Sequence, residues 1–165
     1  MCCVNNLSYV RIIPREVINM SLSSIRKSYL AGFLDGDGSV YVRAKPNSTY
    51  RYGFQVAPYI VLFQSSKNKE AFEKLCSCIG FGRMRERSDG ILEFTINKIE
   101  DIKAFLKIVS PFVILKRKQV ELMTRIVEKK FSVKTEKDFS ELLDLINDFE
   151  KINYSKKRKK RMITP

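Results

Sequence analysis

The sequence predicts an α+β fold: one four-stranded antiparallel sheet that carries helices on a single face. Four short segments alternate apolar with polar residues, which is typical of strands that are buried on one side only. These segments form two pairs, and a short turn joins the members of each pair. Helical patterns precede, separate and follow the pairs. We therefore expect the order αββαββα, a saddle-shaped sheet, and further helices at the C-terminal end.

The first predicted helix begins at a cap on Ser23 or Ser24 and runs through Leu34. Gly36 and Gly38 follow directly, and glycines of this kind end a helical pattern. The carboxylates of this segment therefore lie at the C-terminal end of the helix.

The first pair of strands covers about residues 39–45 and 54–63. In the first of them, Val40 and Val42 alternate with polar and basic side chains. Pro58 interrupts the second strand and predicts either a bulge or a position whose backbone is not paired, because proline has no amide hydrogen.

The second pair of strands covers about residues 82–87 and 92–97. The sequence Ser88-Asp89-Gly90 between them predicts a hairpin turn. The two pairs together complete the predicted sheet.

The remaining helices follow from apolar residues at helical spacing. We expect them over residues 67–79, 99–109, 118–130 and from about 136 to 152. Gly80 ends the first of these and Pro111 the second, while Thr135 with Asp138 predicts a capping box for the last.

The chain divides into three parts by composition. Residues 1–22 form an N-terminal extension, residues 23–154 a single domain, and residues 155–165 a basic tail. The tail contains the run KKRKKR, which we expect to be disordered because adjacent like charges repel each other.

Charge points to an anionic partner. The chain has 31 Lys and Arg against 18 Asp and Glu, a formal net charge of +13. Such a surface attracts polyanions, although a role in solubility alone remains an alternative. Membranes are also anionic, but no stretch approaches the roughly 20 apolar residues of a membrane span, and charges interrupt the N-terminus where a signal peptide would be apolar. We expect no membrane partner and a soluble intracellular protein, in the cytoplasm of a prokaryote or in an organelle.

The absence of histidine narrows the chemistry. Catalysis by Ser–His or Cys–His pairs is excluded, so an enzyme of this sequence must use carboxylate, metal, lysine or tyrosine. The four cysteines, Cys2, Cys3, Cys76 and Cys78, lack the usual zinc spacing. Cys76 and Cys78 lie in a helical pattern and are expected to be reduced, with a disulfide as the alternative.

The polar strand faces should lie together on the side of the sheet that no helix covers. Five of the ten polar strand positions on this face are Arg or Lys, which favours a DNA groove over an ordinary solvated surface. The same face also has two apolar positions, Ala57 and Val61, which could contact a thymine methyl. The predicted DNA-contacting residues are Tyr41, Arg43, Lys45, Asn47, Gln55, Ala57, Tyr59, Val61, Arg83, Arg85, Arg87, Glu93, Thr95 and Lys118.

The segment Leu30-Ala-Gly-Phe-Leu-Asp-Gly-Asp-Gly38 is the most informative motif. Ala31 and Gly32 are small, so a second helix can approach closely. Asp35 and Asp37 lie where the helix dipole disfavours a carboxylate, and a divalent cation would offset this. A calcium loop is the alternative, but the EF-hand spacing and its distal glutamate are absent.

This motif resembles the signature of the LAGLIDADG homing endonucleases. The resemblance extends over about residues 28–130, through the strand order, the turn Ile79-Gly-Phe-Gly82 and the run Lys116-Arg-Lys-Gln119. It implies a sequence-specific, intron-encoded endonuclease that hydrolyses phosphodiester bonds in double-stranded DNA. Since the chain has one copy of the motif, it also implies a homodimer that cuts a long pseudo-palindromic site.

The resemblance further implies roles for individual residues. Asp37 and the Gly36 carbonyl match metal ligands, Gln64 matches the residue that orients water, and Lys116 matches the lysine of the catalytic pocket. The residues that match the dimer interface are Ala31, Gly32 and Asp35, and Asp35 also matches the aspartate that stabilises the end of the helix. The implied cofactor is Mg²⁺, with Mn²⁺ as a substitute and Ca²⁺ binding without cleavage.

One departure from the family pattern affects the pocket. The family often has Arg or Lys at the position of Asn68, and here Lys67 or Lys69 would have to substitute.

Two other functions on the same scaffold remain open: an intron maturase that binds RNA, and an inactive DNA-binding regulator. The joint presence of Asp37, Gln64 and Lys116 favours the nuclease, because RNA binding needs none of them.

Overall fold

The structure is a computed structural model that describes residues 22–153. It confirms the α+β fold and the element order. The strands form one antiparallel sheet in the order β1-β2-β4-β3. They are β1 (Gly38–Pro46), β2 (Phe54–Ser65), β3 (Arg83–Glu86) and β4 (Ile91–Ile96). The helices are α2 (Ser24–Asp37), the 3-10 turn η1 (Ser66–Asn68), α3 (Lys69–Ser77), α4 (Ile99–Val109), α5 (Arg117–Ser132) and α6 (Glu136–Ile152). The predictions for residues 1–21 and for the basic tail lie outside the described residues.

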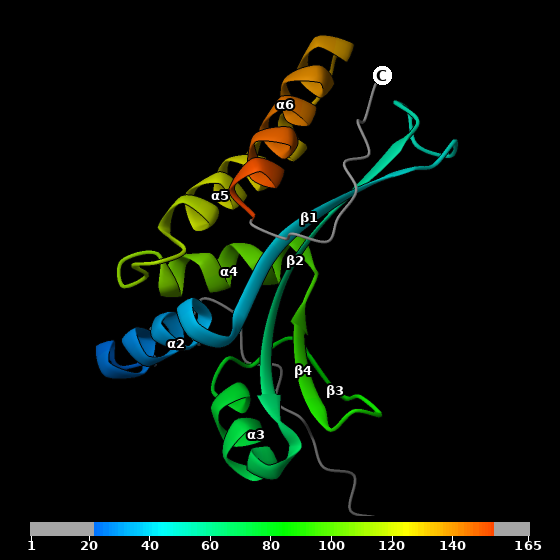
Figure 1. Ribbon diagram of the computed structural model, residues 1–165. Coiled ribbons are helices and arrows are strands. Elements are labelled where there is room, and N and C mark those ends of the chain that lie inside the picture. Colours follow the sequence, from blue (N-terminus) through cyan, green and yellow to red (C-terminus); the bar gives the residue numbers. More distant parts are fainter. Residues whose placement is uncertain (1–21, 154–165) are drawn as a thin grey trace, which may run out of the picture.

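Helices cover one face of the sheet and leave the other open. In Figure 1, α2, α4, α5 and α6 lie on one side of the strands, with α3 at one end of the sheet. The apolar faces predicted for the strands and helices meet between these layers in a single core, to which Leu34, Ile60, Phe105 and Ile146 belong. The helical layer therefore packs against one face of the sheet and leaves the other face without a helix over it.

The motif helix is longer than its glycines suggested. The Ser23 hydroxyl caps it by accepting a hydrogen bond from the Arg26 amide, and α2 continues through Gly36 to Asp37. It stops at Gly38, where β1 begins at once. A Cβ at Gly38 would lie 2.6 Å from the Leu34 carbonyl oxygen, so only glycine allows this abrupt change from helix to strand.

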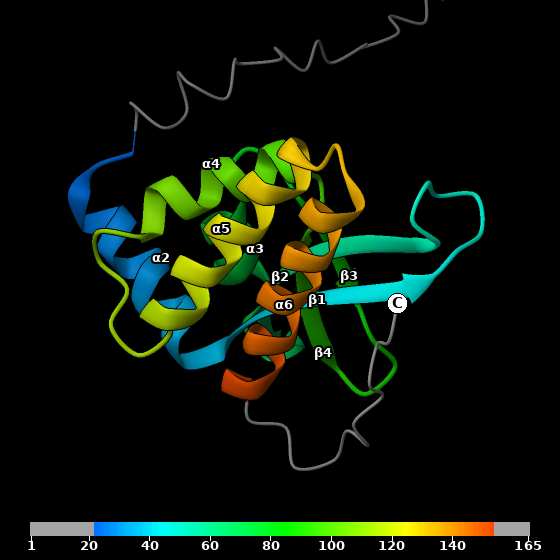
Figure 2. The same cartoon turned by 90° about the horizontal axis from the view of Figure 1, so that it is seen from above.

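The β1–β2 hairpin projects beyond the helices, as Figures 1 and 2 show. Its register runs through the pair Val42–Pro58 without a bulge, so the bulge alternative for Pro58 is wrong. Pairing between β2 and β4 begins only at Ile60, which leaves Pro58 without a strand partner on that side. Two side-chain bonds to the helical layer support the hairpin: Lys130 Nζ donates to the Val56 carbonyl at 2.8 Å, and Tyr52 Oη donates to the Lys134 carbonyl at 2.9 Å.

Other boundaries differ slightly from expectation. β3 ends at Glu86, so Arg87 lies in the turn to β4 and not in a strand. The capping box of Thr135 and Asp138 is confirmed. Its hydrogen bonds, together with Lys129, hold the pKa of Asp138 far below its usual value.

Candidate active site

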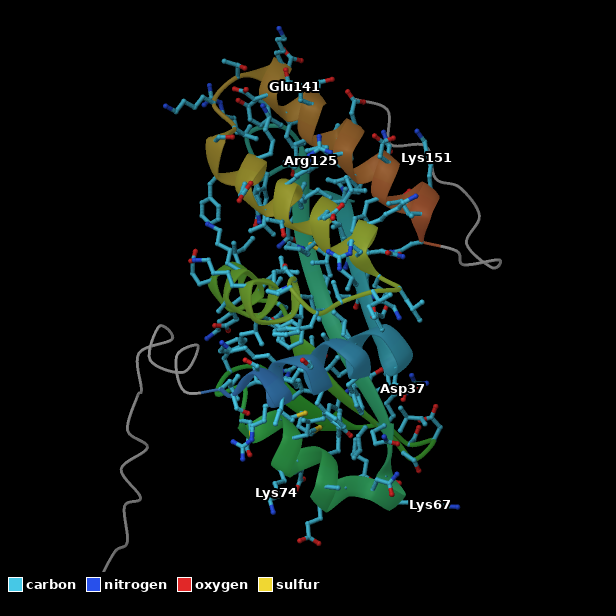
Figure 3. All side chains as sticks on the ribbon, turned by 90° about the vertical axis from the view of Figure 1, so that its left-hand side faces the viewer. Asp37, Lys67, Lys74, Arg125, Glu141 and Lys151 are labelled. Carbon is cyan, nitrogen blue, oxygen red and sulfur yellow. The ribbon has the colours of Figure 1, made fainter. Side chains whose placement is uncertain are left out.

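Asp37 ends the motif helix with its side chain exposed, as Figure 3 shows at the C-terminal end of α2. Within residues 22–153, no hydrogen bond or ion pair occupies the Asp37 carboxylate. Gly36 is exposed as well, and nothing lies within 4 Å of the position a Cβ would take there. A hard cation therefore finds one free carboxylate and an open approach beside it.

Asp35 binds a loop that is 79 or more residues away in the sequence. Its carboxylate accepts backbone hydrogen bonds from Ile114 at 2.7 Å, Leu115 at 3.0 Å and Lys116 at 2.9 Å. Burial acts to raise the pKa of Asp35, but the three backbone hydrogen bonds and the charge of Lys116 outweigh it, so the pKa is lowered. Asp35 is therefore a charged anchor for the segment that carries Lys116.

Lys116 interacts with both aspartates of the motif. Its ammonium group donates to the Asp35 carbonyl oxygen, and its charge interacts with both Asp35 and Asp37. Burial lowers the pKa of Lys116 and outweighs the two carboxylates, which act to raise it. A partly desolvated cation next to an exposed carboxylate is well placed to interact with a phosphate.

Gln64 lies at the same end of the sheet, because Gly38 pairs with Leu62 in the register of β1 and β2. Its carbonyl oxygen Oε1 accepts from the Ser65 amide at 2.8 Å and from Asn68 Nδ2 at 3.4 Å. The Gln64 amide nitrogen is left as the group that can donate to a ligand.

The three candidates to complete the pocket differ in what they bind. Asn68 donates to Gln64, and Lys69 forms an ion pair with Glu86 at 3.0 Å. Within the described residues, no acceptor engages the ammonium group of Lys67, whose side chain is exposed. Lys67 is thus the cation of this segment that remains available.

The uncovered face of the sheet, called the open face below, carries the strand residues predicted to contact DNA. Cross-strand pairs place Tyr41 beside Tyr59 and Lys45 beside Gln55. Asn47 lies in the hairpin tip and Lys118 lies exposed in the first turn of α5.

Arg85 and Arg87 are neutralised by acidic neighbours. Glu93 accepts from Arg85 at 2.6 Å and from Arg87 at 3.3 Å, and Asp89 accepts from Arg87 at 2.7 Å. Each arginine would have to share or release a carboxylate in order to bind a base or a phosphate.

Two predicted site residues are buried within the chain. Val61 belongs to the open face but is only 4% exposed, so neighbouring side chains cover it and a thymine methyl could not reach it without rearrangement. Ala31 is 0% exposed and packs in the core of its own chain, which corrects its assignment to a dimer interface.

One exposed side of α2 instead carries Ile25, Tyr29, Gly32 and Gly36, at helical spacing. Ile25 is 82% exposed, and Leu115 in the loop held by Asp35 is 77% exposed. Sequence reasoning missed these two residues as candidates for an interface, although their apolar character was visible. Large exposed apolar side chains beside glycines mark this side of α2 as a candidate contact surface.

The described residues supply only part of the ligand set of a metal ion. Residues 22–153 contain no group of three or more His, Cys, Asp or Glu side chains arranged to hold a metal. Asp37 and the Gly36 carbonyl fit two positions of an oxygen-coordinated Mg²⁺, which usually keeps several waters and binds substrate phosphates. None of the helices in this part of the chain combines the length and apolar character needed to cross a membrane.

Comparisons with known proteins agree with this geometry. A family model described as LAGLIDADG endonuclease matches residues 30–124. DNA endonuclease I-CreI of Chlamydomonas reinhardtii is 34% identical over 132 residues, 79% of this chain and 80% of the relative. DNA endonuclease I-CvuI of Chlorella vulgaris is 28% identical over 139 residues, 84% of each.

Solved structures agree as well. The homing endonuclease I-CvuI in complex with the I-CreI target superposes with a TM-score of 0.75 at 27% identity, over 82% of this chain and 86% of that one. The archaeal intron-encoded homing endonuclease I-Vdi141I, complexed with DNA, gives a TM-score of 0.74 over 83% and 89% of the two chains. Its identity of 19% supports similarity of fold alone.

Proposed function

The chain belongs to the LAGLIDADG endonuclease family, and from this premise we propose that it is a homing endonuclease that cuts double-stranded DNA at a specific long site. One observation carries the proposal: the exposed Asp37 interacts with the charge of Lys116 and lies at the same end of the sheet as Gln64, and the open face of that sheet is basic. Phosphate contacts from this face would supply affinity, and its hydrogen-bonding side chains would distinguish bases.

We propose that the active form is a homodimer joined along α2. Each chain supplies one free motif carboxylate, so cutting both DNA strands requires two chains. The apolar side chains of Ile25, Tyr29 and Leu115 are exposed in the single chain, and Gly32 between them allows close approach. A two-fold dimer presents the same open face twice and would therefore bind a roughly palindromic site.

The proposed reaction is hydrolysis of one phosphodiester bond per active site. Mg²⁺ held by Asp37 and the Gly36 carbonyl would supply Lewis-acid activation of water and of the leaving 3′ oxygen, with Mn²⁺ as a substitute. Lys116 would neutralise charge on the phosphate, and the Gln64 amide would donate to a water or phosphate oxygen. I-CvuI complexes have been determined in the presence of Mg or Ca, which supports a divalent cofactor in this fold.

The maturase and regulator alternatives receive no support from the structure. RNA binding or DNA binding without cleavage needs neither the exposed Asp37 carboxylate nor the charge of Lys116 that interacts with it, whereas a nuclease uses both.

The test is selection of cleaved sites from a random DNA library with the full chain and Mg²⁺. The proposal expects one long consensus with mirrored half-sites, cut on both strands, and binding without cutting in Ca²⁺. Cleavage that depends on no sequence, or RNA binding without DNA cleavage, would overturn it.

A further inference from the structure

Arg43 on the open face lies against two aromatic rings. Tyr41 and Tyr59 are directly opposite in the register of β1 and β2, with ring centroids 5.1 Å apart and planes 18° apart. The guanidinium carbon of Arg43 lies 5.1 Å from the Tyr41 centroid and 5.4 Å from the Tyr59 centroid. The residue opposite Arg43 is Ala57, whose small side chain leaves room for the arginine to turn over the rings.

The rings orient Arg43 without neutralising it. Aromatic faces attract a guanidinium through their quadrupole, and they leave its hydrogen-bond donors free. No carboxylate lies within ion-pair distance of Arg43 in residues 22–153, whereas Arg85 and Arg87 share Glu93. Arg43 thus keeps its charge and its donors for a ligand, and it has fewer side-chain conformations to lose on binding.

Its place along the strand fixes the part of the target that it would meet. Arg43 lies between Gly38, which follows the proposed metal ligand Asp37, and Asn47 at the hairpin tip. The end of the sheet beside Asp37 faces the centre of a palindromic site and the tip faces its outer end, so Arg43 faces the middle of each half-site.

We propose that Arg43, held in place by Tyr41 and Tyr59, recognises a guanine in the middle of each half-site through the major groove. Guanine presents two adjacent acceptors there, O6 and N7, which match two parallel donors of a planar guanidinium. Adenine presents an acceptor beside a donor, and cytosine presents a donor. The inference rests on the proposed function, because it assigns a base to a residue of the proposed DNA-binding face.

The experiment measures the base preference of the full chain at every position, by binding selection from a DNA library in Ca²⁺. Wild-type protein should prefer guanine over the other bases at one mirrored position, by about 5- to 150-fold. Arg43→Lys keeps the charge but loses the planar pair of donors, so this preference should weaken while all other positions stay unchanged. Arg43→Gln should move the preference at the same position to adenine.

The tyrosines are positioning residues and call for their own variants. Tyr41→Leu and Tyr59→Leu should weaken discrimination at the Arg43 position alone, whereas Tyr59→Phe keeps the ring and should keep the preference. Thermal unfolding checks that each variant is folded. The matched control is Arg125→Lys on α5, in the helical layer that Figure 3 shows, which should leave the whole profile unchanged.

The outcomes separate this inference from the proposed function. If wild-type protein selects a specific site and Arg43→Lys has the same profile, the inference is overturned and the endonuclease stands. Equal weakening at all positions would make Arg43 a phosphate contact and would also overturn it. A wild-type protein without any preferred sequence would overturn the proposed function itself.

Discussion

Asp35 binds Lys116 at two points: its carboxylate accepts the Lys116 backbone amide at 2.9 Å, and its carbonyl oxygen accepts the Lys116 ammonium group. The lysine proposed to act on the phosphate is therefore fixed to the helix that carries Asp37, although 81 residues separate the bonded pair. The loop before α5 cannot move relative to the motif helix without breaking these bonds. Asp35, which is not a proposed metal ligand, therefore fixes the position of Lys116 in the pocket.

Asp35→Asn should destabilise the fold in a way that depends on pH. The native pKa of Asp35 is lowered, so its stabilising effect is present above the pKa of the unfolded chain, near 4, and is lost as pH falls through the native pKa. We expect the variant to lose about 1 kcal/mol at neutral pH, after allowance for solvent screening. Chemical unfolding of both proteins at pH 7 and pH 3 measures the difference, which should shrink at pH 3. The exposed Glu121→Gln is the control, and a difference that grows towards acid would contradict the assignment.

Asp37→Asn should lower the cleavage rate by more than about 100-fold while DNA binding in Ca²⁺ remains, because ligation of Mg²⁺ needs an anionic oxygen. Cleavage assays with excess enzyme and gel-shift titrations measure the two properties separately. Asp144→Asn, exposed on α6 in the helical layer, is a control that should retain cutting. If the Asp37 variant cleaves DNA at the wild-type rate, the assignment of Asp37 as a metal ligand is wrong.

Substitution of Gly32 should disrupt the dimer without unfolding the subunit. A Cβ at Gly32 meets nothing within 4 Å in the single chain, so Gly32→Leu should leave the subunit folded while it overpacks the dimer contact by roughly 1–3 kcal/mol. Sedimentation should show a monomer at concentrations where the wild type is a dimer. Ala31→Leu is the contrasting variant: Ala31 is buried in its own core, so its melting temperature should fall. If the wild-type protein is monomeric both free and on DNA, the proposed homodimer is wrong.

The helices and strands of this fold were predictable because the residue pattern within each element indicates which of its faces is buried. The alternation around Val40 and Val42 and the capping box at Thr135 depend on residues within a few positions. The errors concern tertiary packing. The small size of Ala31 suggests an interface, yet the core of its own chain surrounds it, and Val61 follows the open-face alternation but is covered by neighbours. The roles of Gln64 and Lys116 follow from the resemblance alone, whereas the position of Asp37 at the end of a helix also favours a cation.

The role of Asp35 as an anchor could not be predicted from the sequence. Its three amide partners are backbone groups, which leave no trace in residue type, and they lie far along the chain. Likewise, nothing local showed that Lys69 would bind Glu86 and leave Lys67 available.

Glu93 should control how the two arginines beside it bind DNA. In Glu93→Gln, Arg85 and Arg87 lose their shared carboxylate, so affinity for all sequences should rise and its salt dependence should steepen. Arg85→Ala and Arg87→Ala should instead change the preferred base at mirrored positions, by about 1–3 kcal/mol for each bidentate pair of hydrogen bonds that the variant cannot form. Binding selections at two salt concentrations distinguish these results. If the alanine variants weaken all sequences equally, the arginines contact only phosphates.

Removal of the basic tail should reduce DNA affinity and leave specificity intact. The run KKRKKR lies beyond Asn153, whose side chain donates to the Val40 carbonyl at 2.8 Å and fixes the end of α6 beside β1. Truncation after Ser155 keeps this anchor, so the fold should be unchanged. Each cation that neutralises a phosphate releases counterions, and the slope of log affinity against log salt should become shallower by about 0.9 for each phosphate that the tail no longer neutralises. The cleavage position should not change, because Asp37 and Lys116 remain.

Binding titrations of the full chain and the truncated chain at several salt concentrations measure these slopes. A variant with KKRKKR replaced by six Ser or Gln residues separates charge from length: it should match the truncated chain if the phosphate contacts arise from charge alone. The site selected from a random library serves as the specificity readout for all three proteins. Equal slopes for the full and the truncated chain would show that the tail takes no part in DNA binding. The alternatives are then a nuclear localisation signal or a tail without a function in binding. A changed consensus sequence would contradict the prediction that the tail contacts only phosphates, because phosphate contacts carry no information about base sequence.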